Sequence, residues 1–420
     1  MRRTILPLAL ACAPLACGPA AAESLDEVVA ASLAHSPALA ASKAREDSAE
    51  ASLDEARAQR MPNAQAQGQI GVGRIDPQGF FGLSAADVTP RMAEVTVDLP
   101  IYTGGRINAA KLQAEGGRAA AALATQATVL DVRIQVVRAY SQALAAAQEV
   151  RSYRKLGEEL DETMRQAKLK FSAGEGTSTE VAQANARRAE AQAGLGAAQG
   201  SLATAEARLA LLVGHQVSPS ERMPDAPQVP ASVDDAVAQA LARNPSAAQA
   251  RKAADIARAE ISAARAEGLP NVGLYAEGAS VRDQFFPGYK ADSASVGVRA
   301  SWNFFSGGRV SAKVHRAAAN ARAADADADA AALEIESQAR QSFAAVASAR
   351  AVLAAAEARS AATQEALRGT RLEVSVGAKP QLALLDAERE AIAADTARIN
   401  AQGQLLLAAY TLLAVTGSGD

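Results

Sequence analysis

The stretches LPIYTGGR at 99–106 and WNFFSGGR at 302–309 decide the fold, because they are two copies of one junction in a duplicated chain. Gly105 of the first copy and Gly308 of the second are 203 residues apart, and glycines further along the chain keep the same spacing. A repeat of this length is a whole structural unit rather than a short solenoid module. We therefore expect two copies of one arrangement, each with the order helix, two strands, very long helix, turn and helix.

A second pair of matching motifs follows the junctions: GEGTSTEVAQA at 174–184 and GAKPQLALLDA at 377–387. Each motif opens on a glycine, which we expect to close the preceding helix in a left-handed conformation. No strong helix breaker lies between a junction and its turn, so each long helix should run for roughly 67 residues, or about 100 Å at 1.5 Å per residue. The shorter helices on either side can stack end to end along it and bury its apolar stripe.

Two segments of each repeat change to a period of two, which is typical of a strand with one apolar and one polar face. In one of them, Val95 and Val97 alternate with Thr96 and Asp98. Each segment has about 9–13 residues, the length that crosses a bilayer when a strand is tilted. The predicted strands are 64–74 and 91–102 in the first repeat and 271–281 and 292–305 in the second.

The sequence predicts a signal peptide, two repeats and a linker between them. Arg2 and Arg3 precede a short apolar stretch, and small residues stand before Glu23, as in a cleaved secretory signal. Lipidation of Cys17 is the alternative, because LACG resembles a lipoprotein cleavage site, although Pro14 stands where leucine is expected. The predicted boundaries are 1–22 for the signal peptide, 23–213 for the first repeat with its helical hairpin at 105–213, 214–232 for the proline-containing linker, and 233–420 for the second repeat with its hairpin at 308–416.

Composition and motifs argue against several classes of function. The net charge is −3, whereas a nucleic-acid partner favours a basic face. Aromatic residues make up only 4% of the chain and alanine is abundant, which favours long packed helices over a large aromatic core. His35, His215 and His315 are scattered and no phosphate-binding loop is present, so we expect neither an enzyme nor a cofactor. Asp325 and Asp329 share a helix face, which is more typical of a solvated surface or tunnel lining than of a metal site.

The strands need other copies of the chain. Four strands cannot close a barrel, and open strand edges in lipid cost several kcal/mol per unpaired group. Eight strands enclose an interior filled by side chains, while larger barrels leave an aqueous lumen. Three copies would supply twelve strands and twelve helical columns. We therefore predict an α+β membrane protein whose trimer forms a 12-stranded β-barrel continuous with an α-helical barrel. The alternative is a soluble α+β protein with a helical arm.

These features together resemble the TolC family of bacterial outer-membrane channel proteins. LPIYTGGR and WNFFSGGR are similar to the family's strand-to-helix junctions, and the two turn motifs are similar to its hairpin tips. The resemblance covers essentially the whole chain after the signal peptide. It implies a trimeric, porin-like outer-membrane channel that extends into the periplasm and serves as the exit duct of a tripartite efflux pump or a type I secretion system. The first tip is closer to the type I secretion branch.

The resemblance also implies partners. The hairpin tips would dock to a periplasmic adaptor, and the adaptor would connect the channel to an inner-membrane RND or ABC transporter, with no nucleic acid involved. The docking residues would be Gly174, Thr177, Ser178, Gly377 and Lys379. An alternative function is that of a periplasmic coiled-coil adaptor without a pore, since adaptors also contain long helical hairpins. Adaptors lack two amphipathic strand pairs of bilayer length.

A periplasmic gate is the last feature that the resemblance implies. By position after the tip glycines, Glu180 matches an acidic residue of the family's first tip, Lys379 a basic residue of its second, and Asp386 a carboxylate of the pore constriction. An ion pair of Glu180 with Lys379 would hold neighbouring hairpins together. Ala383 stands where a second constriction carboxylate is expected, so the carboxylate ring would be thinner. The alternative is that these three charges are ordinary exposed helix residues.

Overall fold

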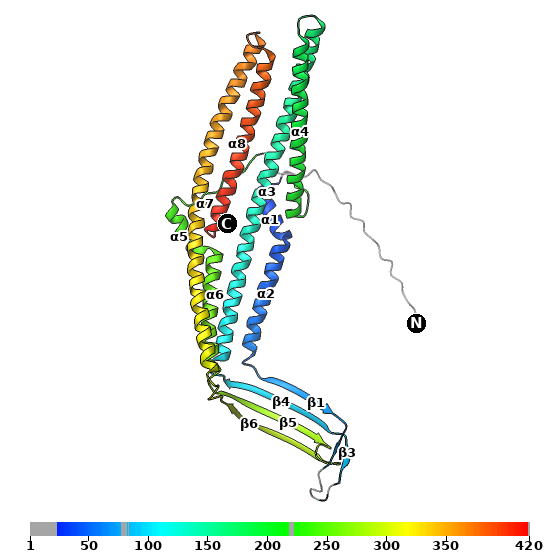
Figure 1. Cartoon of the computed structure of the whole chain (residues 1–420), viewed down its shortest axis with the longest axis vertical. Coiled ribbons are helices and arrows are strands. Elements are labelled where there is room, and N and C mark those ends of the chain that lie inside the picture. The colour runs from blue at the N-terminus through cyan, green and yellow to red at the C-terminus, as the bar shows by residue number, and fades with distance from the viewer. Residues whose placement is uncertain (1–22, 77–81, 83, 218–221, 419–420) are drawn as a thin grey trace, which may run out of the picture.

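The molecule is elongated, with long helices along one axis and a small sheet at one end (Figure 1). The computed structural model describes residues 23–76, 82, 84–217 and 222–418. The predicted signal peptide at 1–22 and the alternative lipidation site Cys17 lie outside these residues. The turns of the two helical hairpins lie at the end farthest from the sheet, so the chain separates its strands from its hairpin tips by the length of the helices.

The two repeats contain the same main elements in the same order, which confirms the predicted duplicated unit, and the first repeat adds a short strand pair at 73–75 and 86–88. The long helices α3 and α7 have 67 residues each, and the helices that precede the strands, α2 and α6, have 22 residues each. The first repeat consists of α1 (Leu25–His35), α2 (Pro37–Ala58), β1 (Asn63–Ile70), β4 (Arg91–Tyr102), α3 (Arg106–Ser172) and α4 (Ser178–Val213). The second consists of α5 (Val233–Arg243), α6 (Pro245–Ala266), β5 (Asn271–Arg282), β6 (Lys290–Ser301), α7 (Arg309–Ser375) and α8 (Gln381–Val415).

Each long helix is covered by two shorter ones. Helices α2 and α4 both pack along α3, and α6 and α8 both pack along α7, as the matching lengths predict (Figure 1). Helix α3 also contacts α6 and α8, which joins the two repeats. The largest core cluster forms around the middle of α3, where Val136, Val137 and Tyr140 are fully buried. The Tyr140 hydroxyl donates a hydrogen bond to the Glu23 carbonyl at 2.9 Å, which ties the start of the described chain to this core.

Local sequence signals set where the helices begin. The Ser36 side chain accepts a hydrogen bond from the Leu39 amide, and Pro37 occupies the first turn of α2, where its missing N–H has no helical partner to lose. The long helices follow glycines in the left-handed region, with φ of 91° at Gly105 and 84° at Gly308. A side chain is strained at such φ values, so these glycines allow the sharp change from strand to helix.

The main sheet has four antiparallel strands in the order β1-β4-β5-β6. In its register Val97 lies opposite Ala64 and Ala276, whereas Thr96 lies opposite Gln65 and Glu277. Because successive side chains in a strand point to opposite faces, the sheet gains one apolar and one polar face. The alternating apolar and polar residues predicted for each strand therefore line up across the sheet, with the apolar side chains on one face and the polar ones on the other.

Two predicted strand ends were wrong. The strand predicted at 64–74 ends at Ile70, and residues 73–75 instead form β2 (Gly73–Ile75), which pairs with β3 (Ala86–Val88). The main ladder stops at the pair Ile70–Arg91. Pro90, the residue just before β4, has no N–H, so it cannot donate the next hydrogen bond of the ladder to β1. The strand predicted at 292–305 begins at Lys290 and ends at Ser301. Ser301 pairs with Asn271, the first residue of β5, so residues 302–305 have no strand beside them.

Candidate functional site

The apolar face of the sheet is exposed in the single chain. Val95 is 52% exposed, Val298 65% and Val296 82%, and Leu274 belongs to the same exposed face. The register places these side chains on one side, with Val298 opposite Leu274 and Val296 opposite Ala276. A continuous exposed apolar surface of this kind marks a site of contact with another protein or with a membrane.

The opposite face carries a cluster of charges that sequence reasoning did not single out. Arg299 of β6 donates to Asp98 of β4 at 3.3 Å and lies 3.7 Å from Glu277 of β5. The same guanidinium lies 4.4 Å from the centre of the Tyr275 ring. The alternation in the sequence placed these residues on the polar face of their strands. It could not predict that their side chains would contact one another across three strands. The cluster makes this face charged as well as polar.

Aromatic side chains gather at both ends of the sheet. Trp302 and Phe304 follow β6 at the end next to the helices, where the Trp302 ring nitrogen donates to the Gly268 carbonyl at 3.1 Å. At the far end, the β5–β6 connection brings Tyr289 edge-on to Phe285 and Phe286, with ring centres 5.0 and 5.3 Å apart. Tyr and Trp rings at two levels, with an apolar band between them, are typical of a protein that sits in a bilayer.

The hairpin tips have the predicted turn geometry. Gly174 and Gly377 have φ of 78° and 73°, so both glycines adopt the expected left-handed conformation. In the first tip, Thr177 caps α4, which begins at Ser178, and Glu180 completes a capping box by accepting from the Thr177 amide at 3.0 Å. The second tip has Pro380 in the equivalent place, with no side-chain cap. The two tips therefore match in backbone shape but differ in their hydrogen bonds.

The structure does not bring the predicted gate pair together within one chain. Glu180 is held in its own capping box, and the Lys379 ammonium lies 2.7 Å from Glu373 at the end of α7. An ion pair of Glu180 with Lys379 could form only between hairpins of different copies, and in that form it stays a prediction. Sequence reasoning missed Glu373 because it precedes the tip glycine and was assigned to the long helix.

Asp386 is also paired. Arg187 of α4 donates to the Asp386 carboxylate of α8 at 3.2 Å and to Glu190 at 3.0 Å. This link spans the two hairpins beside an apolar cluster that includes Leu385 and Leu160. A constriction built on Asp386 would therefore contain a guanidinium beside each carboxylate, which reduces the net negative charge that sequence reasoning expected there.

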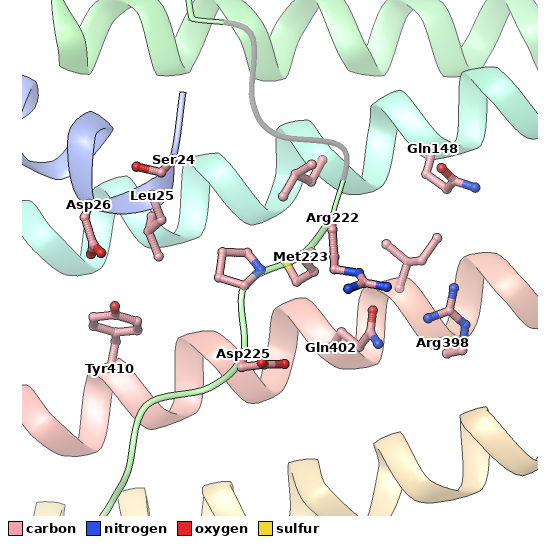
Figure 2. A pocket seen from close by; sticks show the side chains of 13 residues that line it. Ser24, Leu25, Asp26, Gln148, Arg222, Met223, Asp225, Arg398, Gln402 and Tyr410 are labelled. Atoms are coloured by element: carbon pink, nitrogen blue, oxygen red, sulfur yellow. The ribbon is translucent and has the colours of Figure 1, made fainter. Parts of the chain in front are cut away.

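A cavity lies at mid-height, beneath the connection between the repeats. Its volume is about 790 Å³, and it is lined by the start of α1, by α3, by α8 and by residues 222–225. Figure 2 shows Arg222 and Asp225 on the connecting segment, facing Arg398 and Gln402 on α8. Burial, together with the nearby charge of Asp26, raises the pKa of Tyr410, which lines the same cavity.

Within the described part of the chain, no group of three or more His, Cys, Asp or Glu side chains is placed to hold a metal ion. Over the same residues, no helix combines the length and the apolar character needed to cross a bilayer.

Comparison with known proteins gives a family, relatives and a shared fold. Residues 28–215 and 236–418 match the family described as outer membrane efflux protein. The outer membrane efflux protein BepC of Brucella suis is 31% identical over 260 residues, which cover 61% of this chain and 57% of BepC. The alkaline protease secretion protein AprF of Pseudomonas aeruginosa is 29% identical over 267 residues, or 62% of this chain and 56% of AprF. The matched part of the chain thus spans less than two thirds of each relative's length.

The fold matches solved structures over nearly its whole length. The crystal structure of the CmeC outer membrane channel of Campylobacter jejuni superposes with a TM-score of 0.79, covering 94% of this chain and 86% of CmeC. The two sequences are only 15% identical, so this likeness concerns the fold. It agrees with the duplicated α+β arrangement described above.

Proposed function

Because the chain belongs to the outer membrane efflux protein family, we propose that three copies form an outer-membrane channel. This channel is the exit duct of a tripartite efflux pump or a type I secretion system, and it carries out no chemistry of its own. The observation that carries the proposal is the four-stranded sheet, which has an exposed apolar face, a charged opposite face and two outer edge strands, β1 and β6. The strands lie in the outer membrane, and the helices extend into the periplasm.

The strand directions support closure by identical copies. All neighbours in the sheet are antiparallel, so β6 of one copy runs opposite to β1 of the next. Two copies would give eight strands, whose interior side chains fill completely, whereas twelve strands leave an aqueous lumen. The inward face carries the cluster of Arg299, Asp98, Glu277 and Tyr275, and the wider lumen of twelve strands leaves room for these polar side chains and for water. Closure by three copies satisfies the edges and keeps a path open.

The hairpin tips are the proposed docking site for a periplasmic adaptor, which links the channel to an inner-membrane RND or ABC transporter. The two tips present equivalent apolar side chains, because Leu169 and Leu372 each lie five residues before a tip glycine and are 63% and 69% exposed. Three copies would display six such leucines around one rim, beside Thr177, Ser178 and Lys379. An adaptor without a pore, the alternative function, would leave the apolar face of the sheet in water.

Disulfide cross-linking between copies tests the proposed closure. Within the chain, Val97 of β4 lies opposite Ala276 of β5. If the contact between copies repeats this register, the repeat spacings of 203 and 208 residues place Ala300 opposite the neighbouring copy's Gly68. Ala300→Cys combined with Gly68→Cys should therefore give covalent dimers and trimers and no larger species, because paired residues have Cα atoms within disulfide reach.

The matched control is Ala300→Cys with Gln67→Cys, whose side chains lie on opposite faces and should not cross-link. Both native cysteines, Cys12 and Cys17, lie in the predicted signal peptide, so the introduced pair reports alone. Denaturing gels without reductant give the readout. A ladder that continues beyond three chains, or equal cross-linking of both variants, would argue against a closed trimer.

The gate is tested by reversing one charge. We expect Lys379→Glu to raise single-channel conductance in planar bilayers, because it replaces attraction to Glu180 of a neighbouring copy with repulsion. An exposed ion pair contributes only ~0–1 kcal/mol, so three copies sum to at most roughly 3 kcal/mol, and about 1 kcal/mol of this is enough to change the open population several-fold. In the same proposal Asp386→Ala mainly lowers cation selectivity.

The swap Glu373→Lys with Lys379→Glu separates the two roles of this lysine. It restores the ion pair inside the chain but leaves the charge facing Glu180 reversed. Conductance should stay raised in the double variant. A return to the original conductance would mean that Lys379 acts only through Glu373 and that these charges hold no gate.

A further inference from the structure

One buried carboxyl group lies where the two helical hairpins meet. Glu388 of α8 is 4% exposed. Its Oε1 atom accepts from Arg371 of α7 at 3.2 Å, and the same Arg371 nitrogen lies 3.5 Å from Glu159 of α3. The three side chains come from three helices, with Glu159 in the first repeat and the other two in the second. This cluster therefore joins the hairpins, and it lies below the tips.

The cluster has more acceptors than donors. Arg371 serves both carboxylates, and the Oε2 atom of Glu388 is buried without a hydrogen-bond partner among the described residues. An unpaired buried oxygen is costly, and it is costlier when it carries charge. Burial, and next the charge of Glu159, raise the pKa of Glu388 to about 7, although Arg371 opposes this. Periplasmic pH values can therefore change the charge of this group.

The other charged groups around Glu388 do not replace its missing partner. A cleft of about 250 Å³ beside it is lined by Lys155 of α3, Arg368 of α7 and Asp395 of α8, in addition to Glu159 and Arg371. Arg368 pairs with Glu365, and Asp395 pairs with Arg398 at 2.8 Å. The next residue of α8, Arg389, turns to Glu190 of α4 at 3.7 Å. Glu159 is thus the group with which a protonated Glu388 can exchange a hydrogen bond.

We propose that a proton on Glu388 ties α8 to α3, and that loss of this proton loosens the joint between the two hairpins near their tips. When protonated, the Glu388 hydroxyl donates to the Glu159 carboxylate, which still pairs with Arg371, and all three groups are satisfied. When Glu388 is ionised, two carboxylates face each other with a single guanidinium between them. The inference concerns a joint within one chain and so goes beyond the proposed channel.

The direction of the pH effect follows from linkage. Glu388 is protonated more readily in the joined state than in a separated, solvated state, where its pKa returns toward the ordinary 4.5. The joined state is therefore favoured at acid pH and loses its advantage as pH rises from about 4.5 to about 7. We expect the ratio of separated to joined hairpins to rise on the order of tenfold between roughly pH 5.5 and pH 8.5.

Distances between spin labels on the two tips test the proposal. Ser172 and Ser375 are repeat-equivalent, exposed residues at the ends of α3 and α7. Labels at Ser172→Cys and Ser375→Cys of the full chain in detergent, with Cys12 and Cys17 replaced by alanine, should show a long-distance population that grows on the order of tenfold with pH. The distance measurement does not depend on channel conductance. It therefore tests this proposal separately from the proposed channel function.

Three variants identify the group responsible. Glu388→Gln, which copies the protonated shape, should keep the tips joined at both pH values, and Glu159→Gln should weaken the response by removing the facing charge. Asp395 is a carboxyl group on the same helix that already pairs with Arg398. The Asp395→Asn variant should therefore show the same pH response as the original protein. An unchanged distance distribution in the original protein would overturn the proposal, as would a pH response that persists in Glu388→Gln.

Discussion

Val296→Arg is expected to prevent stable insertion of the assembled protein into the outer membrane. Val296 stands in the middle of β6 (Lys290–Ser301), on the apolar face, and is 82% exposed in the single chain. On the lipid face of a membrane barrel, an arginine at the bilayer midplane costs about 2–4 kcal/mol. Three copies bring the cost to roughly 6–12 kcal/mol per trimer, which is comparable to the total stability of a typical domain.

The neighbouring residue provides the matched control. Ser295 lies on the polar face and pairs across the strands with Glu277, so Ser295→Arg places the same charge beside a carboxylate in water. We expect Ser295→Arg to accumulate as normal trimer and Val296→Arg to be lost or to remain unassembled. The amount of heat-resistant trimer in purified outer membranes measures the difference. Equal amounts of the two variants would mean that this face does not contact lipid.

The sequence predicted what depends on residues close together in the chain. The 203-residue spacing and the absence of helix breakers predicted two long helices, and the period of two predicted which strand residues share a face. The wrong strand ends have another origin, because alternation continues past Ile70 and Ser301 after their neighbouring strands have stopped. A strand ends where its partner ends, and a partner far along the chain leaves no mark in the local pattern.

Contacts between distant helices were equally hidden. Nothing in the local pattern singles out Glu388, because it resembles any other charged residue on a polar helix face. Its burial results from α3 and α7 packing on both sides of α8, and its partners are 17 and 229 residues away. The same holds for Asp386, whose pairing with Arg187 joins residues 199 apart and changes the charge expected at the constriction. Site residues could be placed on elements, but their partners depended on tertiary packing.

The two junction motifs differ in what surrounds their first glycine, so the same substitution should have different effects in the two repeats. Gly104 and Gly307 are repeat-equivalent, with φ of 61° and 56°. A β-carbon on Gly104 would lie 2.6 Å from Leu269 Cβ and 2.9 Å from the Ala266 carbonyl oxygen, whereas one on Gly307 would have nothing within 4 Å in the same chain. Gly104 thus packs the first junction against the second repeat.

Gly104→Ala should therefore destabilise the chain itself. A side chain in the left-handed region costs about 1–2 kcal/mol, and forcing a methyl group into a packed contact adds about 1–3 kcal/mol. The total of roughly 2–5 kcal/mol per chain compares with about 1–2 kcal/mol for Gly307→Ala, where the backbone strain acts alone. Denaturant unfolding of the dissociated chain in detergent, followed by its helical circular dichroism, should separate the two variants.

Gly307→Ala should show its main effect only on assembly. The repeat spacing of 208 residues makes Met61 the equivalent of Leu269, and Met61 is 65% exposed in the single chain. In a closed trimer, the neighbouring copy's Met61 would stand against Gly307 as Leu269 stands against Gly104. The trimer fraction of Gly307→Ala should therefore fall further than its loss of about 1–2 kcal/mol in chain stability explains. If Gly307→Ala assembles like the original protein, the contact between copies does not repeat the contact inside the chain, and the register used to predict the β6–β1 closure fails with it.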